Sequence, residues 1–149
     1  MATTTENYIE EETVNGISLE DVDLFNKGMF RRERPERLDG HSYKIENVPN
    51  GQNDNISFYV TINNDENNQP FELFIDCRDI LLYEFLTAIG RQISLMLQFD
   101  IPVMYIVDEL RDIHSGNTGH YIPGTGIYCN SLVAHIAHKL EEHYINNSK

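Results

Sequence analysis

The sequence has no tryptophan, only two cysteines, and eleven lysine and arginine residues against 24 aspartate and glutamate residues. Cys77 and Cys129 lie far apart and form no CxxC pair, which excludes a zinc site built from cysteines and a thioredoxin-like motif. The formal net charge of −13 repels phosphate backbones and excludes broad binding to nucleic acids. In a cytosolic protein, both thiols are expected to be reduced.

A long hydrophobic run and a secretory leader are also missing. No apolar run approaches the ~20 residues that span a bilayer. The N-terminal MATTTENYIEEETVNG has neither the basic n-region nor the apolar h-region of a signal peptide. We therefore expect a protein of the cytoplasm. The frequent use of Asn and Ile is consistent with an AT-rich genome, and in the case of a viral gene the protein would act in the host cytoplasm.

A length of 149 residues fits one domain with a hydrophobic core. Residues 1–30 are acidic over most of their length and lack sustained apolar periodicity, so we expect a disordered or loosely packed arm, in which residues 17–25 can form a short amphipathic turn. Residues 31–149 are expected to form the folded domain. Lys27 lies shortly before this domain, and four arginines lie among its first residues.

Hydrophobic periodicity predicts three strands and then three helices. Residues 43–48, 56–63 and 71–77 read as strands, and Ile56, Phe58, Val60 and Ile62 share one face of the second strand. Helical spacing follows over residues 81–99, 103–113 and 132–144. Asp100 is placed to cap the second helix and Ser131 the third. The predicted fold is α+β, a three-stranded antiparallel meander followed by three helices packed on one face.

Several segments follow one another in an order that resembles a known family. They are RPERLDGHSYKI, FYVTIN, PFELFIDCRD, LLYEFLTAIGRQISLMLQFDIPVMYIVDEL and GTGIYCNSLVAHIAHKL. Together, over about residues 31–145, they resemble the TSCPD-type accessory domain near the C-terminus of adenosylcobalamin-dependent (class II) ribonucleotide reductases. Asp-Ile-Pro falls where that family usually has Gly-Val-Pro. CNSLVA (residues 129–134) stands in place of the T-S-C-P-D motif, so the chemistry of that motif is not carried over.

The resemblance implies a non-catalytic binding or interaction module in nucleotide metabolism, with a reductase-related protein as partner and no cofactor of its own. The alternative is a small-molecule nucleotide binder that sequesters a nucleotide signal. A third reading, part of a split ribonucleoside-diphosphate reductase, is disfavoured because a thiyl-radical reductase needs a large barrel and several redox cysteines. We therefore assign no catalytic residue.

The candidate ligand-binding residues fall into a basic entry segment and a Gly-rich loop, residues 115–130. Glycines let backbone N–H groups approach an anion ahead of a helix N-terminus, although no complete phosphate motif is present. A structural turn is the alternative for the loop, and pairing with Glu33 and Glu36 the alternative for the arginines. The candidates are Arg31, Arg32, Arg34, Arg37, Asn117, Thr118, His120, Tyr121, Gly124, Thr125, Gly126, Cys129, Asn130 and Ser131.

Three further groups of residues could carry chemistry, but for each we favour an interpretation without a chemical role. His135, His138 and Glu142 lie on one stripe of the last predicted helix and could begin a metal site, but we interpret them as a solvated polar face and expect no metal. The acidic cluster Asp108, Glu109 and Asp112 is likewise interpreted as solvated. Cys129 precedes a predicted helix start, which can lower a thiol pKa, yet it has no partner fixed by sequence.

Self-association is expected from the first long helix, residues 81–99. Its apolar residues occur on more than one side, and such a helix must be buried on all sides. A three-stranded meander also leaves two open edges. We therefore predict a homo-oligomer, most simply a two-fold dimer built on that helix or on a sheet edge.

Overall fold

The computed structural model describes residues 13–14, 17–18 and 27–147. The chain divides into two compact units, Met1–Arg32 and Glu33–Lys149. In the first unit, β1 (Thr13–Val14) pairs with β2 (Ile17–Ser18) in antiparallel register. Most of the expected acidic arm and most of the expected turn at residues 17–25 lie outside the described residues.

The second unit is built on an antiparallel sheet with the strand order β3-β4-β5. These strands are β3 (Asp39–Pro49), β4 (Asn55–Asn64) and β5 (Pro70–Asp76). Alternation along β4 buries Phe58, Val60 and Ile62, while Tyr59 between them is exposed on the other face. The expected meander is therefore confirmed, with each strand close to its predicted position.

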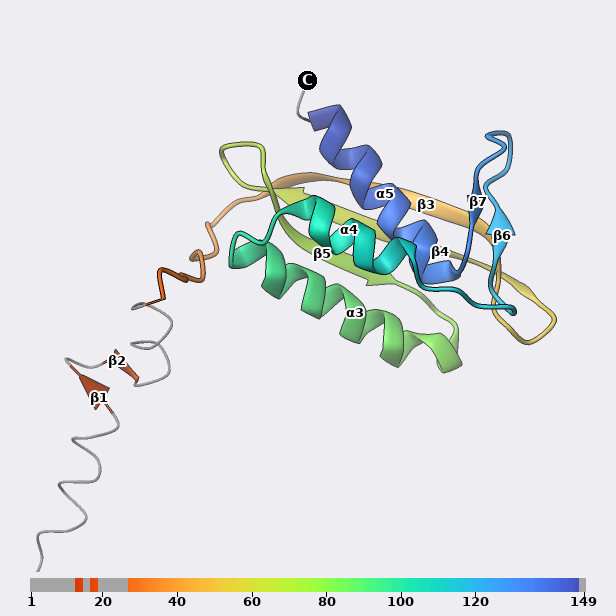
Figure 1. The fold of residues 1–149 in the computed structure, drawn as a ribbon, viewed down its shortest axis with the longest axis horizontal. Coiled ribbons are helices and arrows are strands. Elements are labelled where there is room, and N and C mark those ends of the chain that lie inside the picture. The colour runs from red at the N-terminus through yellow and green to blue at the C-terminus, as the bar shows by residue number, and fades with distance from the viewer. Residues whose placement is uncertain (1–12, 15–16, 19–26, 148–149) are drawn as a thin grey trace, which may run out of the picture. The chain divides into compact units, whose positions relative to one another are not determined.

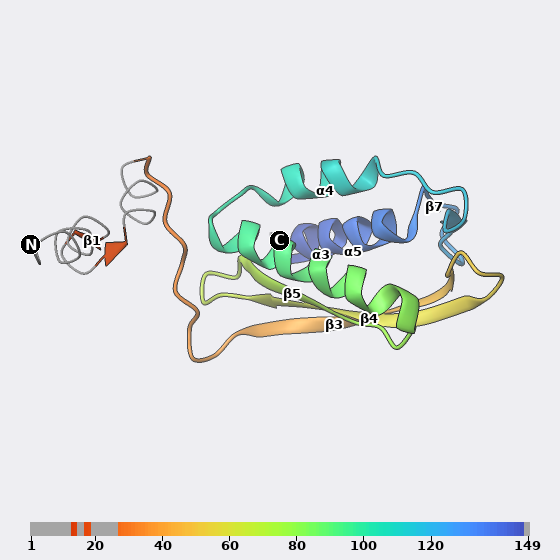
Figure 2. The same cartoon turned by 90° about the horizontal axis from the view of Figure 1, so that it is seen from below.

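Three helices cover one face of this sheet, as Figure 2 shows. They are α3 (Ile80–Gln98), α4 (Val103–Arg111) and α5 (Leu132–Asn147). Helices α3 and α5 lie next to the sheet, and α4 lies over them on the side away from it (Figure 2). Side chains from the inner face of the sheet and from all three helices form a single core. The α+β fold class is confirmed.

Helix α3 is fixed to the open edge of β5 by a small residue and a hydroxyl group. A Cβ atom at Gly90 would lie only 3.3 Å from the carbonyl oxygen of Leu73. One turn later, Ser94 Oγ accepts a hydrogen bond from the N–H of Leu73 at 2.9 Å and lies 3.0 Å from its carbonyl oxygen. The hydroxyl therefore satisfies strand groups that a further strand would otherwise pair. Figure 1 shows α3 running beside β5.

The connection between α3 and α4 differs from the expected one. Asp100 does not cap α4, whose N-cap is Pro102 without a side-chain hydrogen bond. Instead Asp100 ends α3 in the left-handed region, with φ of 58°. Its N–H donates to Leu97 O at 3.0 Å and that of Ile101 to Met96 O at 3.1 Å, the pattern that usually has glycine at the left-handed position. This is the position at which the resembled family has Gly.

The predicted Gly-rich loop contains a β-hairpin that sequence periodicity missed. Strand β6 (His120–Tyr121) pairs with β7 (Tyr128–Cys129), with His120 opposite Cys129 and Tyr121 opposite Tyr128. Figure 1 shows the hairpin beside the N-terminal end of α5, with its tip pointing away from that end. Strands of two residues are too short to give a detectable alternation.

The expectation that no apolar stretch is long enough to span a bilayer is wrong. Helix α3 is long and apolar enough to cross a membrane by length and composition, a test that core helices of soluble proteins also pass. Within the second unit, α3 packs on β5 and supplies Leu86, Ile93 and Leu97 to the core.

Candidate functional site

The structure separates the two groups of candidate ligand residues. Arg34 and Arg37 lie where β3 begins, because Arg37 binds Asp39, the first residue of that strand, with Nη2 3.0 Å from Oδ1. The Gly-rich hairpin lies at the other end, where a Cβ at Gly51 after β3 would be 3.4 Å from Asn117. Arg31 and Arg32 belong to the first unit. Arg34, Arg37 and the hairpin therefore do not form one site.

Arg34 has a structural partner other than Glu33 or Glu36. Its guanidinium donates to both carboxylate oxygens of Glu72 on β5, from Nε at 3.2 Å and from Nη2 at 3.1 Å. The Glu72 side chain is only 5% exposed, and Asn63 Nδ2 donates to it as well. A fork-shaped contact with a buried carboxylate holds the entry segment on the sheet, so Arg34 is committed to the fold.

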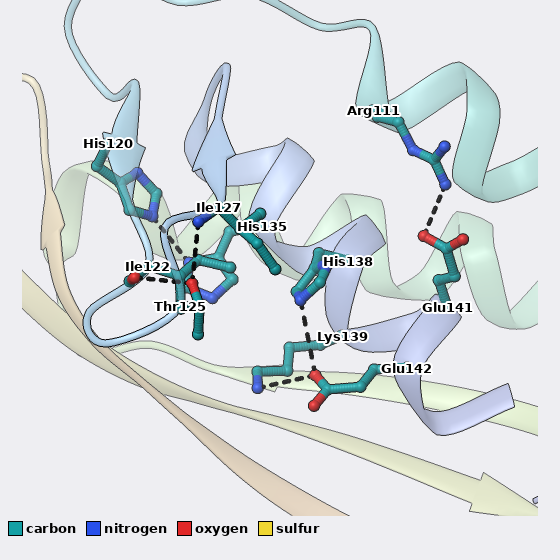
Figure 3. Close-up of polar contacts among 10 residues, drawn as sticks. All are labelled: Arg111, His120, Ile122, Thr125, Ile127, His135, His138, Lys139, Glu141 and Glu142. Carbon is teal, nitrogen blue, oxygen red and sulfur yellow. Dashed lines mark hydrogen bonds and ion pairs between the residues drawn. The ribbon is translucent and has the colours of Figure 1, made fainter. Parts of the chain in front are cut away.

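The glycines of the loop form the tip of the β6–β7 hairpin and not a cradle at a helix end. Gly124 and Gly126 both have positive φ, and Thr125 between them closes the turn. Thr125 Oγ1 donates to Ile122 O at 2.9 Å and accepts from Ile127 N at 3.1 Å, as Figure 3 shows. These residues form a structural turn.

The N-terminus of α5 is satisfied by the protein itself. Ser131 caps the helix as predicted, since its Oγ accepts from Ala134 N at 3.0 Å. Thr118 Oγ1 accepts from Leu132 N at 3.1 Å. Two of the N–H groups that an anion would need are thus already hydrogen-bonded, which argues against a phosphate site at this helix end.

A buried cluster of two histidines and a cysteine lies at the base of the hairpin. His120 on β6 and His135 on α5 meet with Nε2 of the first 2.8 Å from Nδ1 of the second (Figure 3). His120 Nδ1 lies 2.7 Å from the carbonyl oxygen of Thr118, which can only accept, so this nitrogen carries the proton. In the neutral rings, His135 therefore donates to His120 and keeps a lone pair on its own Nε2. That nitrogen is buried and has no hydrogen-bond partner.

Burial sets the protonation of this cluster. Loss of solvent lowers the pKa of His135 to about 3, with smaller contributions from the charges of His120, Lys139 and His138. Burial raises the pKa of the Cys129 thiol, although Lys139 lowers it somewhat. The expected solvated face is therefore wrong for His135, and the nearby helix start does not lower the pKa of Cys129 below its usual value. His138 remains partly exposed, 3.8 Å from Glu142 (Figure 3).

These side chains could hold a metal ion. One donor atom from each of His120, Cys129 and His135 lies within 4.8 Å of the others, and all three residues are buried. Neutral imidazoles and a thiolate are zinc ligands. The 2.8 Å between the two histidine nitrogens is shorter than the roughly 3.3 Å between ligands of a tetrahedral zinc ion, so the rings would separate slightly and His135 Nδ1 would lose its proton.

A cavity of about 230 Å³ opens beside the cluster. Cys129 forms part of its wall. The rest comes from α4, β7, α5 and the residues between β7 and α5, among them Arg111, Tyr128, Asn130, Ala134, His138 and Glu141. Arg111 Nη2 already donates to Glu141 at 2.7 Å across the gap between α4 and α5 (Figure 3). The acidic side chains Asp108, Glu109 and Asp112 on or next to α4 are exposed, as predicted.

A second buried histidine was not recognised as such in the sequence. His143 on α5 accepts a hydrogen bond from Tyr43 O–H at Nδ1, 2.7 Å away, and donates from Nε2 to Asn64 Oδ1 at 2.9 Å. Burial lowers its pKa to about 4, with a further contribution from the charge of His41. It continues the stripe of Leu132, Ile136 and Leu140, the spacing that could have revealed it.

Both buried histidines should make the fold sensitive to acid. Their pKa values lie below the unfolded value of 6.5, so the unfolded chain binds more protons as the pH falls from 6.5 toward 4. The free energy of unfolding should then drop by up to about 1.4 kcal/mol per pH unit for each histidine. Urea titrations at pH 7.5 and 5 should show a weaker loss in His143→Gln, and an unchanged loss in the exposed control His114→Gln. Equal losses in all three proteins would contradict this account.

Metal binding by the cluster of His120, Cys129 and His135 can be measured directly. We expect Zn²⁺ to raise the thermal midpoint of the full chain and Co²⁺ to give a thiolate charge-transfer band. Both effects should disappear in Cys129→Ser and His135→Ala and persist in the control Cys77→Ser. Binding by the surface residues His138 and Glu142 instead would survive both cluster substitutions and be lost in His138→Ala.

Comparison with known proteins assigns the chain to a family. A family model described as the TSCPD domain matches residues 31–144. No significant match is found among curated proteins or among solved structures. The matched segment includes the three-stranded sheet, all three helices except the last residues of α5, and the β6–β7 hairpin with its buried histidines. The chain therefore belongs to the TSCPD domain family.

Proposed function

We propose that this chain is a non-catalytic accessory module of nucleotide metabolism that binds a reductase-related protein through the β6–β7 hairpin. TSCPD domains are associated with accessory roles in ribonucleotide reductases, and the family match spans most of the chain. The cytoplasm, or the host cytoplasm for a viral gene, is where such a partner would be met.

The observation that carries the proposal is the exposed aromatic pair on a fixed hairpin. Tyr121 is 68% exposed and Tyr128 53%, and their rings pack edge to face with centroids 4.9 Å apart. Tyrosine is enriched at protein interfaces because it combines an apolar body with a polar tip. The hydrogen bond of His120 to His135 anchors the base of the hairpin to α5, so little ordering is needed when a partner binds.

The non-catalytic part of the proposal rests on the cysteines. Both are buried and free, and burial raises the pKa of each thiol. A thiolate, not a thiol, is the reactive form, so neither cysteine is prepared for redox chemistry. Deoxynucleotide formation by the purified chain with reductant and adenosylcobalamin would contradict this part.

Binding to a reductase can be tested with matched tyrosine variants. At physiological salt, the tagged full chain should retain the ribonucleotide reductase of its source organism or, in the case of a viral gene, of the host. Tyr121→Ala with Tyr128→Ala should weaken retention by about tenfold or more, since central aromatic residues carry much of the energy of an interface. Tyr105→Ala on α4, equally exposed, is the control. Recovery of no reductase or other nucleotide enzyme would contradict the proposal.

A second candidate function, a nucleotide binder that sequesters a signal, is favoured by the cavity beside the hairpin. Tyr128 offers a ring for stacking on a base, while Arg111 and His138 offer N–H donors to a phosphate. Arg111 would have to exchange its carboxylate partner Glu141 for the ligand.

This candidate is tested by thermal shift with nucleotides, cyclic dinucleotides and adenosylcobalamin. A true ligand at 100 times its Kd should add about 2.7 kcal/mol to the free energy of unfolding. Arg111→Gln should remove the shift, and Arg78→Gln, an exposed arginine away from the cavity, should keep it. Flat curves with every compound would exclude nucleotide sequestration and leave the reductase proposal standing.

A further inference from the structure

One side of α3 carries large apolar side chains that the described part of the chain leaves exposed. This outer face of α3 is defined by the exposed residues that point away from the core, Leu81, Glu84, Phe85, Ala88, Arg91, Gln92 and Leu95. Phe85 is 63% exposed and Leu81 53%, and only 22% of the apolar stretch of the helix is buried. Covering large apolar side chains removes them from water and so favours association.

The helix cannot turn this face inward. Its opposite stripe, which includes Leu86, Ile93 and Leu97, is already in the core. The contacts of Gly90 and Ser94 with Leu73 fix the rotation of the helix against β5. Cover for the outer face of α3 must therefore come from chain outside the described residues or from another molecule.

Two leucines of this face lie at equal distances from Ala88. Leu81 and Leu95 each lie seven residues from it, one before and one after. In an antiparallel pair of α3 helices with a two-fold axis at Ala88, each Leu81 would lie opposite Leu95 of the second copy. Glu84 and Arg91, four and three residues from the axis, would come within reach across the pair. A small residue at the axis lets the two helices approach closely.

Other occupants match this pattern less well. Glu84, Arg91 and Gln92 lie among the apolar residues of the face and would be buried without partners in lipid. The net charge of −13 also opposes binding to an anionic membrane surface. The two leucines at equal distances from Ala88 and the opposite charges of Glu84 and Arg91 match a second copy of the same helix turned by a two-fold rotation.

We propose that the chain forms a two-fold homodimer in which the outer face of α3 packs antiparallel against the same face of a second copy, with Ala88 at the axis and Glu84 paired to Arg91 across it. This surface lies on a different element from the β6–β7 hairpin, so dimer formation does not depend on the proposed function.

The first test is the mass of the full chain by light scattering at micromolar concentration. The dimer should show twice the 17.3 kDa of the chain. Leu81→Glu should give a folded monomer, as judged by circular dichroism, because Leu81 is more than half exposed within one copy and would lie opposite Leu95 of the second. Glu84→Arg should weaken association by about tenfold or more, and the double variant Glu84→Arg with Arg91→Glu should restore it.

The second test is a cross-link at the axis. Both native cysteines are buried, so an introduced surface cysteine reports its own surroundings. Ala88→Cys should form a disulfide-linked dimer under mild oxidation, and Ser57→Cys on the other face of the sheet should not. A mass of 17.3 kDa with no cross-link would overturn the proposal. Monomers that sediment with phosphatidylcholine vesicles, or that need Phe85 to retain the reductase, would overturn it too and assign the face to a membrane or to that partner.

Discussion

The contact of α3 with the edge of β5 is the constraint on which the rest of the second unit depends. Gly90 lets the helix approach the carbonyl of Leu73, and Ser94 satisfies the strand groups that would otherwise face solvent. This contact covers the middle of one edge of the sheet, at Leu73, and fixes which side of α3 enters the core. It also decides which side is left outside, so the internal packing and the exposed surface have one cause.

The interior of this domain contains hydrogen-bonded polar side chains as well as apolar ones. Helix α5 is buried on most sides, and two of its inward positions are histidines that belong to hydrogen-bonded chains. One chain runs from Tyr43 through His143 to Asn64 and joins the helix to the sheet. The other runs from Thr118 through His120 to His135 and joins the helix to the hairpin. Directional contacts of this kind fix the positions of neighbouring elements more narrowly than apolar packing does.

Sequence periodicity was sufficient for the three long strands and three helices, because each presents several turns or alternations to one core. It failed where the outcome depends on distant contacts. Asp100 looks like a cap for the following helix but ends the preceding one, since the chain must turn before Pro102. His135 and His143 are polar by composition, yet their partners come from segments 15 and 79 residues away. The separation of Arg34 from the Gly-rich hairpin likewise follows from the strand order, which no local pattern shows.

The bond between Arg34 and Glu72 bears on where the folded unit begins. Glu72 is an acidic residue almost enclosed by the domain, and its positive partner comes from the entry segment before the first long strand. Without that segment, the sheet would keep a carboxylate that is shielded from water and lacks its counter-charge, a costly state. Electrostatics thus sets the N-terminal boundary of this domain. The hydrophobic core is complete from β3 onward, but the charge of Glu72 is balanced only if the folded unit begins at least five residues before β3, at Arg34.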